Sequence, residues 1–191
     1  MVDTDAAAIE RAKAGDGDGF RTLVERYSRS VFRLAYRMTG NEFDAEDVVQ
    51  ETFLRAYRQL NHYESRASFS TWIYRIASNY ALDLMRSRRR HEDRRVAQVE
   101  ADDSDPLDTL KGTEPSQDRA YYSTQVRAKL DAALAELSDQ ERTAFLLRHC
   151  EGQSIEEIGS VLSIGTSATK NSIFRAVRKL RESLDPVVNT I

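Results

Sequence analysis

The sequence predicts an all-α protein made of two small helical domains joined by a flexible acidic linker. Apolar residues recur at helical spacing over most of the 191 residues. No stretch alternates apolar and polar residues with a period of two, so no sheet is expected. A segment rich in Asp, Ser, Thr and Gly separates residues 1–92 from residues 120–191. The linker is therefore placed at residues 93–119.

The N-terminal domain is expected to be a bundle of amphipathic helices. The first spans residues 18–39, where apolar side chains step by three and four, and it ends at Gly40-Asn41. The second begins near Asp44. A third begins at Phe69 and runs to Arg90, within a cluster of six arginines: Arg86, Arg88, Arg89, Arg90, Arg94 and Arg95.

The linker lacks the apolar residues that a core needs. Pro106 and Pro115 fall in it, among acidic and small polar residues. Such a composition cannot bury enough surface to offset the entropy lost on ordering the chain. The linker is therefore expected to be a flexible tether.

The C-terminal domain carries two capping-box patterns. The first runs from Ser138 to Glu141 and the second from Ser154 to Glu157, so a helix is expected to begin at each. The second helix is short, and a tight turn at residues 163–165 follows it. A longer basic helix then runs from about Thr166 to about Leu184. This succession predicts a helix-turn-helix over residues 154–184.

The basic helix of this motif has the residue types of a DNA-reading surface. Arg can bond guanine in the major groove, and Phe can contact a thymine methyl. The alternative is an ordinary helical hairpin with a solvated basic face. The capping pattern, the tight turn and the absence of acids from Lys170 to Arg181 favour DNA binding.

Two further stretches leave alternatives open. The helix from Phe69 to Arg90 combines Trp72, Tyr74, Asn79 and Tyr80 with a basic end, a combination that suits single-stranded DNA. On this stretch alone, however, a plain aromatic core is favoured. Residues 44–58 mix acids with arginines, which is typical either of a solvated helix or of a protein-binding surface.

Composition indicates a non-enzymatic protein of the cytoplasm. The single cysteine, Cys150, cannot form an internal disulfide, and the acidic N-terminus has no secretory pattern. No apolar run suits membrane insertion. No metal-ligand set or nucleophile–base pair is evident, so no catalytic residue, metal or cofactor is expected. The net charge of −3 conceals the local basic clusters.

The three stretches together resemble the extracytoplasmic-function (ECF, group 4) sigma factors of bacterial RNA polymerase, in the sigma-70 family. Residues 44–58 resemble region 2.2, residues 69–90 resemble regions 2.3 and 2.4, and residues 138–181 resemble region 4. The resemblance implies that the chain binds core polymerase at the β′ clamp helices and the β flap. It further implies that region 2 opens and reads the −10 promoter element and that region 4 reads the −35 element.

Site residues follow from the resemblance. Those expected to bind polymerase are Asp47, Gln50, Glu51, Leu54 and Arg55. Those expected to bind the −10 DNA are Tyr63, Ser68, Trp72, Asn79, Asp83, Arg86, Arg88 and Arg89. Asn79 and the loop before Phe69 are expected to hold a base flipped out of the strand. Those expected to bind the −35 DNA are Thr169, Lys170, Asn171, Ser172, Phe174, Arg175, Arg178 and Lys179.

One segment departs from the family pattern. Many members carry Ser-Arg where this chain has Asn171-Ser172, so its −35 preference is expected to differ, since Asn favours adenine. An anti-sigma factor is a further expected partner. Two other readings are a helix-turn-helix regulator that acts without polymerase and a sigma-like decoy that titrates a partner.

Overall fold

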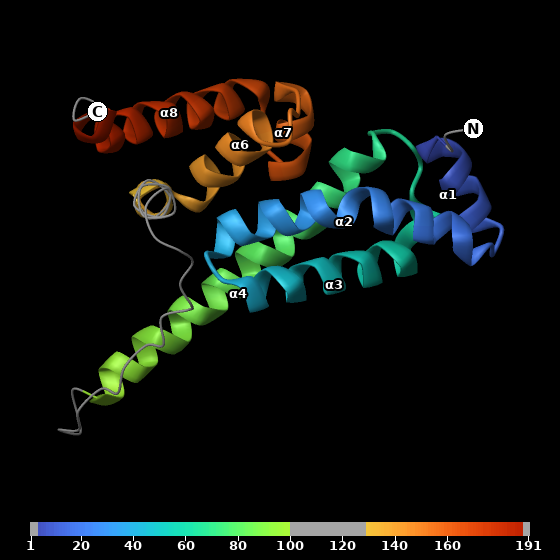
Figure 1. Ribbon diagram of the computed structural model, residues 1–191, viewed down its shortest axis with the longest axis horizontal. Helices are drawn as coiled ribbons and strands as arrows, with labels where there is room; N and C mark the ends of the chain where they lie inside the picture. Colours follow the sequence, from blue (N-terminus) through green and yellow to red (C-terminus); the bar gives the residue numbers. More distant parts are fainter. Residues whose placement is uncertain (1–3, 100–128, 189–191) are drawn as a thin grey trace, which may run out of the picture.

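The computed structural model of the chain describes residues 4–99 and 129–188, and every regular element in these ranges is helical (Figure 1). The all-α prediction is therefore confirmed for the described chain. Most of the expected linker lies outside these residues. Its first residues, 93–99, belong to the helix that begins at Phe69.

The N-terminal half is a bundle of helices. Its elements are α1 (Asp5–Lys13), α2 (Gly17–Thr39), α3 (Glu42–Gln59), a short 3-10 turn (Leu60–His62) and α4 (Phe69–Val99). Gly40 adopts the left-handed conformation that ends α2, as predicted, and the Asn41 side chain caps α3 by accepting from the Asp44 amide. Leu23, Leu34 and Ile73 are fully buried between the helices. Helix α1 was not predicted.

The C-terminal half contains a helical stretch at 129–135 followed by α6 Asp139–His149, α7 Ile155–Leu162 and α8 Thr166–Val188. Both predicted capping boxes are formed: Ser138 and Glu141 bond each other's backbone amides at the start of α6, and Ser154 and Glu157 do so at the start of α7. The helix-turn-helix prediction is confirmed, although α8 ends at Val188, beyond the predicted end near Leu184.

The two halves pack against each other. Helix α7 lies against the first turns of α4, and α6 lies against the C-terminal part of α2 (Figure 1). Buried apolar residues of both halves, Ile73 and Ile158 among them, form one continuous cluster. No helix within 4–99 or 129–188 is long and apolar enough to cross a membrane.

Candidate nucleic-acid and polymerase interfaces

The outer face of α3 carries the residues expected to bind polymerase. Its inner face is buried through Ala45, Val48 and Ala56, so residues on the opposite side reach the surface. Asp47, Gln50 and Leu54 are exposed, whereas Glu51 and Arg55 are half-buried.

Side-chain bonds hold part of this face in place. The Tyr80 hydroxyl donates to the Asp47 carboxylate at 2.8 Å, which raises the pKa of Tyr80, and Arg55 lies 4.8 Å from the centre of the Tyr80 ring. Arg55 also bonds Glu51 at 2.7 Å, one helical turn away. The α3 surface is therefore joined to the middle of α4.

The sequence did not reveal an apolar groove beside this face. The groove lies between α2 and α3, and its lining includes Phe32, Val49 and Gln50. Phe43 and Tyr57 on α3 are also highly exposed, at 80% and 60%. Exposed aromatic side chains next to a charged rim are typical of protein-binding surfaces.

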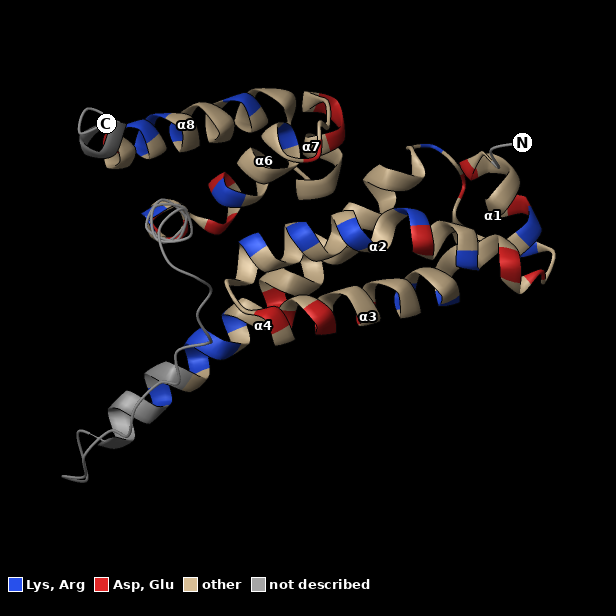
Figure 2. Ribbon diagram, in the orientation of Figure 1, with Lys and Arg blue, Asp and Glu red and all other residues tan. Residues whose placement is uncertain are grey.

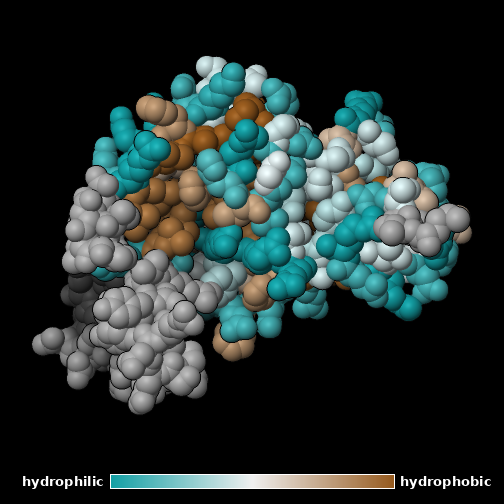
Figure 3. Space-filling view, turned by 45° about the horizontal axis from the view of Figure 1, so that its top comes forward, coloured by the Kyte–Doolittle hydropathy of each residue, from teal (hydrophilic) through white to brown (hydrophobic). Residues whose placement is uncertain are grey.

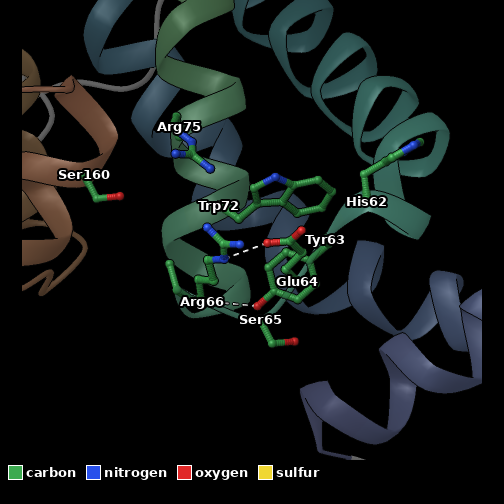
Figure 4. Close-up of a pocket in the computed structure, with 9 residues that line it drawn as sticks. His62, Tyr63, Glu64, Ser65, Arg66, Trp72, Arg75 and Ser160 are labelled. Carbon is green, nitrogen blue, oxygen red and sulfur yellow. Dashed lines mark hydrogen bonds and ion pairs between the residues drawn. The ribbon is translucent and has the colours of Figure 1, made fainter.

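A pocket of about 350 Å³ lies where the loop before α4 meets the first turns of that helix (Figure 4). Tyr63 and Trp72 supply aromatic walls with ring centres 4.9 Å apart, and both side chains are mostly buried. The Tyr63 hydroxyl donates to the Ala67 carbonyl, and burial raises the pKa of Tyr63. An uncharged aromatic wall of this kind suits stacking with a base.

Two arginines at this pocket were missed by the sequence reading. Arg75 lines the pocket from α4, and Arg66 lines it from the loop, where it forms an ion pair of 2.6 Å with Glu64. The Arg66 side chain is 86% exposed. Its place between two predicted site residues, Tyr63 and Ser68, was a usable signal.

The expectation that Asn79 holds the flipped base stays a prediction. Asn79 is exposed on α4 but does not line the pocket. It follows Arg75 by four residues, so it lies one turn further along the same face. Asp83 and Arg86 are exposed beyond it. Asn79, Asp83 and Arg86 therefore form an exposed row on α4 that leads away from the pocket, here called the α4 path.

The basic end of α4 is exposed (Figure 2), and three of its described arginines have acidic partners: Arg86 pairs with Asp83 at 3.5 Å, and Arg88 and Arg89 pair with residues of other helices. Arg88 pairs with Asp44 at 2.5 Å, and burial of Asp44 raises the pKa of that carboxyl despite the nearby guanidinium. Arg89 pairs with Asp139 of α6 at 2.8 Å.

The helix-turn-helix is held together by a close approach at Gly159. A Cβ there would lie 2.9 Å from the Ile164 carbonyl oxygen and 3.2 Å from Thr169 Oγ1. The turn passes through Ser163, which has a left-handed backbone. Only a residue without a side chain therefore fits between α7 and the start of α8.

Helix α8 exposes five of its eight predicted reading residues: Lys170, Asn171, Phe174, Arg175 and Arg178. Phe174 is 67% exposed, which is unusual for a large apolar side chain without a partner. The ribbon of α8 is blue at several Lys and Arg positions in Figure 2, so this helix has a basic character.

Two of the residues predicted to bind the −35 DNA, Thr169 and Ser172, are buried and do not lie on the exposed face of α8. Thr169 donates its hydroxyl to the Gly165 carbonyl, and Ser172 donates to the Ala168 carbonyl, each one turn back along α8. Lys179 is half-buried and pairs with Glu141 at 2.7 Å. The hydroxyls thus face the interior of the domain.

No group of three or more His, Cys, Asp or Glu side chains that could hold a metal ion occurs among the residues with described positions. Cys150 is partly buried, and burial raises the pKa of its thiol. The candidate binding surfaces are therefore the α3 face, the aromatic pocket with the α4 path, and the outer face of α8.

Comparison with known proteins finds a matching protein family for each half of the chain. Residues 23–91 match the family described as Sigma-70 region 2, and residues 127–180 match Sigma-70 region 4. The chain is 33% identical over 178 residues to the ECF RNA polymerase sigma factor SigW of Bacillus subtilis, which covers 92% of this chain and 94% of SigW. It is 36% identical over 162 residues to the ECF sigma factor SigE of Mycolicibacterium smegmatis, covering 85% of this chain and 60% of SigE.

A solved structure shares the fold. It is the co-crystal structure of the sigma factor RpoE in complex with the anti-sigma factor NepR from Bartonella quintana, with a TM-score of 0.63 and 22% identity, covering 87% of this chain and 96% of that one. The sequence relatives extend over both the pocket and the helix-turn-helix. The chain belongs to the extracytoplasmic-function sigma factors, the promoter-recognition subunits of bacterial RNA polymerase.

Proposed function

We propose that this sigma factor divides promoter recognition between the two DNA-facing surfaces described above. The aromatic pocket and the α4 path take the melted −10 strand, with a flipped base against Tyr63 and Trp72 and phosphates near Arg66 and Arg86. The outer face of α8 takes the −35 duplex through Asn171, Phe174 and Arg175, among others.

We further assign core polymerase binding to the α3 face. The surface for the β′ clamp helices consists of Asp47, Gln50, Leu54 and the Glu51–Arg55 pair. The neighbouring apolar groove would bury apolar side chains of the polymerase. Helix α8 and its neighbours are assigned to the β flap as well as to DNA. Like its named relatives, the protein is expected to act in the cytoplasm.

An anti-sigma factor is the expected regulator. The RpoE structure that shares this fold contains one. The exposed apolar residues of this chain, with Phe43 and Phe174 the most exposed, offer contact sites for such a protein. Figure 3 shows further apolar surface toward the C-terminal half of the molecule.

The observation that carries the proposal is the presence of two different reading surfaces in one chain. A pocket with aromatic walls and arginines suits an unpaired base, and a helix-turn-helix suits duplex DNA. A regulator that binds only duplex DNA needs the second surface but not the first.

Reconstituted transcription tests the proposal. The full chain is added to sigma-free core polymerase with a library of genomic fragments, and transcript starts are mapped. We expect a small set of shared start sites that depend on the chain. Duplex binding without any chain-dependent transcript would identify the helix-turn-helix regulator instead, and polymerase binding without transcripts would identify the decoy.

A further inference from the structure

Helix α1 contacts the aromatic pocket from behind. It precedes residues 23–91, the stretch that matches region 2, and it lies beside the 3-10 turn that leads into the pocket (Figure 1). The last residue of α1 is Lys13. Its Nζ donates to the Tyr63 carbonyl oxygen at 2.9 Å and lies 5.8 Å from the centre of the Tyr63 ring. An element outside the matched stretch therefore contacts one wall of the pocket.

The bond from Lys13 to Tyr63 is the stronger of the two polar contacts that Lys13 makes. The side chain of Lys13 is partly buried, and a charged donor forms a stronger hydrogen bond to a carbonyl than a neutral one does. The other contact is an ion pair of 4.0 Å with Glu10, one turn back along α1. Glu10 is exposed, so this pair contributes little.

The two aromatic walls of the pocket are supported in different ways. Trp72 belongs to α4, and its amide donates to the Ser68 carbonyl at 3.1 Å, so the helix fixes its backbone. Tyr63 belongs to the pocket loop, residues 63–68, which is neither helix nor strand. The loop turns at Ser65 with a left-handed backbone, which costs free energy in a residue with a Cβ. The loop side of the pocket therefore needs other contacts to order it.

Tyr63 is held at three of its polar groups. Its amide donates to the Leu60 carbonyl at 3.0 Å, and its hydroxyl donates to the Ala67 carbonyl at 2.7 Å. Both of these partners are close to Tyr63 in sequence. Its carbonyl oxygen is bonded by Lys13, which is 50 residues away. The bond from Lys13 therefore fixes the position of the Tyr63 wall relative to the rest of the bundle.

Helix α1 is packed closely enough to serve as a fixed support. Ala8 and Ile9 are buried against the bundle. A Cβ at Gly19 of α2 would lie 2.6 Å from the Ala8 carbonyl oxygen and 2.7 Å from the Ala12 amide nitrogen. The backbones of α1 and α2 are therefore in direct contact, and α1 cannot shift without disturbing α2.

The other end of α1 reaches the same aromatic cluster through Tyr27. The Asp5 carboxylate accepts a hydrogen bond from the Tyr27 hydroxyl, and burial raises the pKa of Tyr27, so the phenol keeps its proton. The Tyr27 ring lies 5.4 Å from the Phe69 ring. The Phe69 ring in turn lies 5.8 Å from that of Tyr63 and 5.5 Å from that of Trp72. Both ends of α1 thus contact the walls of the pocket, one directly and one through two rings.

We propose that α1 braces the flipped-base pocket and that Lys13 is the positioning residue of this brace. This inference rests on the proposed function, which assigns the pocket to a base of the −10 strand. Lys13 does not contact the base; it fixes Tyr63, against which the base stacks. A pocket that is ordered before binding avoids the entropy cost of being ordered by its ligand, so its affinity for the base is higher.

Lys13→Met tests the inference, because it removes the ammonium group and keeps the apolar length of the side chain. Wild type and variant are each assembled with sigma-free core polymerase and titrated with a labelled single-stranded −10 oligonucleotide from a mapped start site. An abasic site is then placed at each position in turn, and the position with the largest loss in the wild type marks the flipped base. The preference for this base over the abasic site should fall about tenfold in Lys13→Met.

Two further variants are matched controls. Lys13→Arg keeps a charged donor of similar reach and should retain most of the preference. Arg21→Met also removes one positive charge, but Arg21 is exposed on α2 and pairs with Asp18 at 2.9 Å, so it should behave as the wild type does. Equal base preference in Lys13→Met and in the wild type would overturn the inference.

Salt dependence separates positioning from a direct phosphate contact. If Lys13 bound a phosphate, Lys13→Met would lower the slope of log affinity against log salt by about 0.7 and would weaken the intact and abasic oligonucleotides equally. The inference predicts an unchanged slope and an unchanged affinity for the abasic oligonucleotide. A parallel loss for both oligonucleotides would overturn the role of Lys13 as a positioning residue.

Fluorescence of the free full-length chain gives a readout that needs neither DNA nor polymerase. Trp72 is the single tryptophan of the sequence, and it is buried in the pocket wall. Lys13→Met should loosen the pocket loop and increase the quenching of Trp72 by acrylamide, whereas Lys13→Arg and Arg21→Met should not. Quenching of Lys13→Met equal to that of the wild type would show that Lys13 does not order the pocket.

The wild-type titration distinguishes failure of the inference from failure of the proposed function. If the wild-type holoenzyme binds every abasic oligonucleotide as tightly as the intact one, no base occupies the pocket, and the −10 assignment is rejected together with the brace. A wild-type preference that Lys13→Met retains in full would reject the brace alone.

Discussion

The two DNA-facing surfaces of this sigma factor differ in what covers them. On α8, Asn171, Phe174 and Arg175 are exposed, whereas two of the residues assigned to the −10 DNA, Ser68 and Arg89, contact carboxylates of the C-terminal half. The residues of α8 turn outward because small side chains such as Thr169 and Ala176 fill its inner face. The difference teaches that the duplex-reading surface is complete within its own half, while the strand-reading surface depends on how the halves are arranged.

The largest expected effect comes from Arg142, which ties the two halves together. Burial lowers the pKa of its guanidinium, but the group keeps its charge and donates to the Leu134 carbonyl of its own half and to the Met38 carbonyl at the end of α2. Arg142→Ala leaves both carbonyls without this donor and should cost about 2–4 kcal/mol of unfolding free energy. Urea unfolding should change from one transition to two, one for each half. A single transition at the wild-type midpoint would show that Arg142 does not couple the halves.

Gly159 offers a way to damage only the duplex-reading half. Because a Cβ there would meet the Ile164 carbonyl, Gly159→Ala should cost about 1–3 kcal/mol and weaken binding to −35 duplex. Core polymerase binding should persist. Gly165→Ala is the control, since its Cβ would meet nothing within 4 Å. Equal behaviour of the two variants in duplex binding would count against the close packing of α7 and α8.

A pair of arginine variants separates the two surfaces. Arg175→Ala should lose about 1–3 kcal/mol in −35 duplex binding and relax the preference at one base. Arg66→Ala should leave duplex binding intact and weaken binding of the opened strand in the polymerase complex. The measurements are duplex titration and the rate of promoter opening. If each variant impairs both assays equally, the division of labour is wrong.

The smallest expected effect concerns acid stability, to which Glu157 and Asp44 contribute with opposite signs. The pKa of Glu157 is lowered, chiefly by the Ser154 backbone amide, so its contribution to stability is present above the usual value of 4.5 and lost as the pH falls through the lowered value. The pKa of Asp44 is raised by burial, so protonation of this carboxyl as the pH falls removes a desolvation cost and stabilises the fold. Below pH 4.5, region 4 should therefore lose less unfolding free energy in Glu157→Gln than in the wild type, by about 1 kcal/mol. Thermal melts from pH 6 to pH 3 measure this, and an unchanged slope would contradict it.

The sequence predicted most where local backbone bonding determines the structure. Ser154 and Glu157 placed the start of α7, and the turn after Leu162 placed α8, because capping bonds involve residues three apart. Helix α1 was missed because nine residues rich in Ala show little apolar periodicity. The extension of α4 beyond Arg90 was missed because its polar turns carry no apolar signal either.

The site was predicted less completely, and for a physical reason. Thr169 and Ser172 were expected to bind the −35 DNA from the resemblance, yet each donates its hydroxyl to a carbonyl of its own helix and is buried. Arg66 and Arg75 line one pocket only because the loop folds beside α4. The contacts of Glu151 could not be predicted, because its partners Tyr74 and Arg33 are far away in sequence.

Photo-crosslinking tests the central claim most directly. A photoreactive residue replaces Arg66 in one full-length variant and Phe174 in another, and each is assembled with core polymerase on a promoter found by transcript mapping. The account predicts that position 66 crosslinks to unpaired −10 nucleotides only after the promoter opens, and that position 174 crosslinks to the −35 duplex before and after opening. Crosslinks from both positions to one DNA element, or a position 66 crosslink to closed duplex, would contradict it.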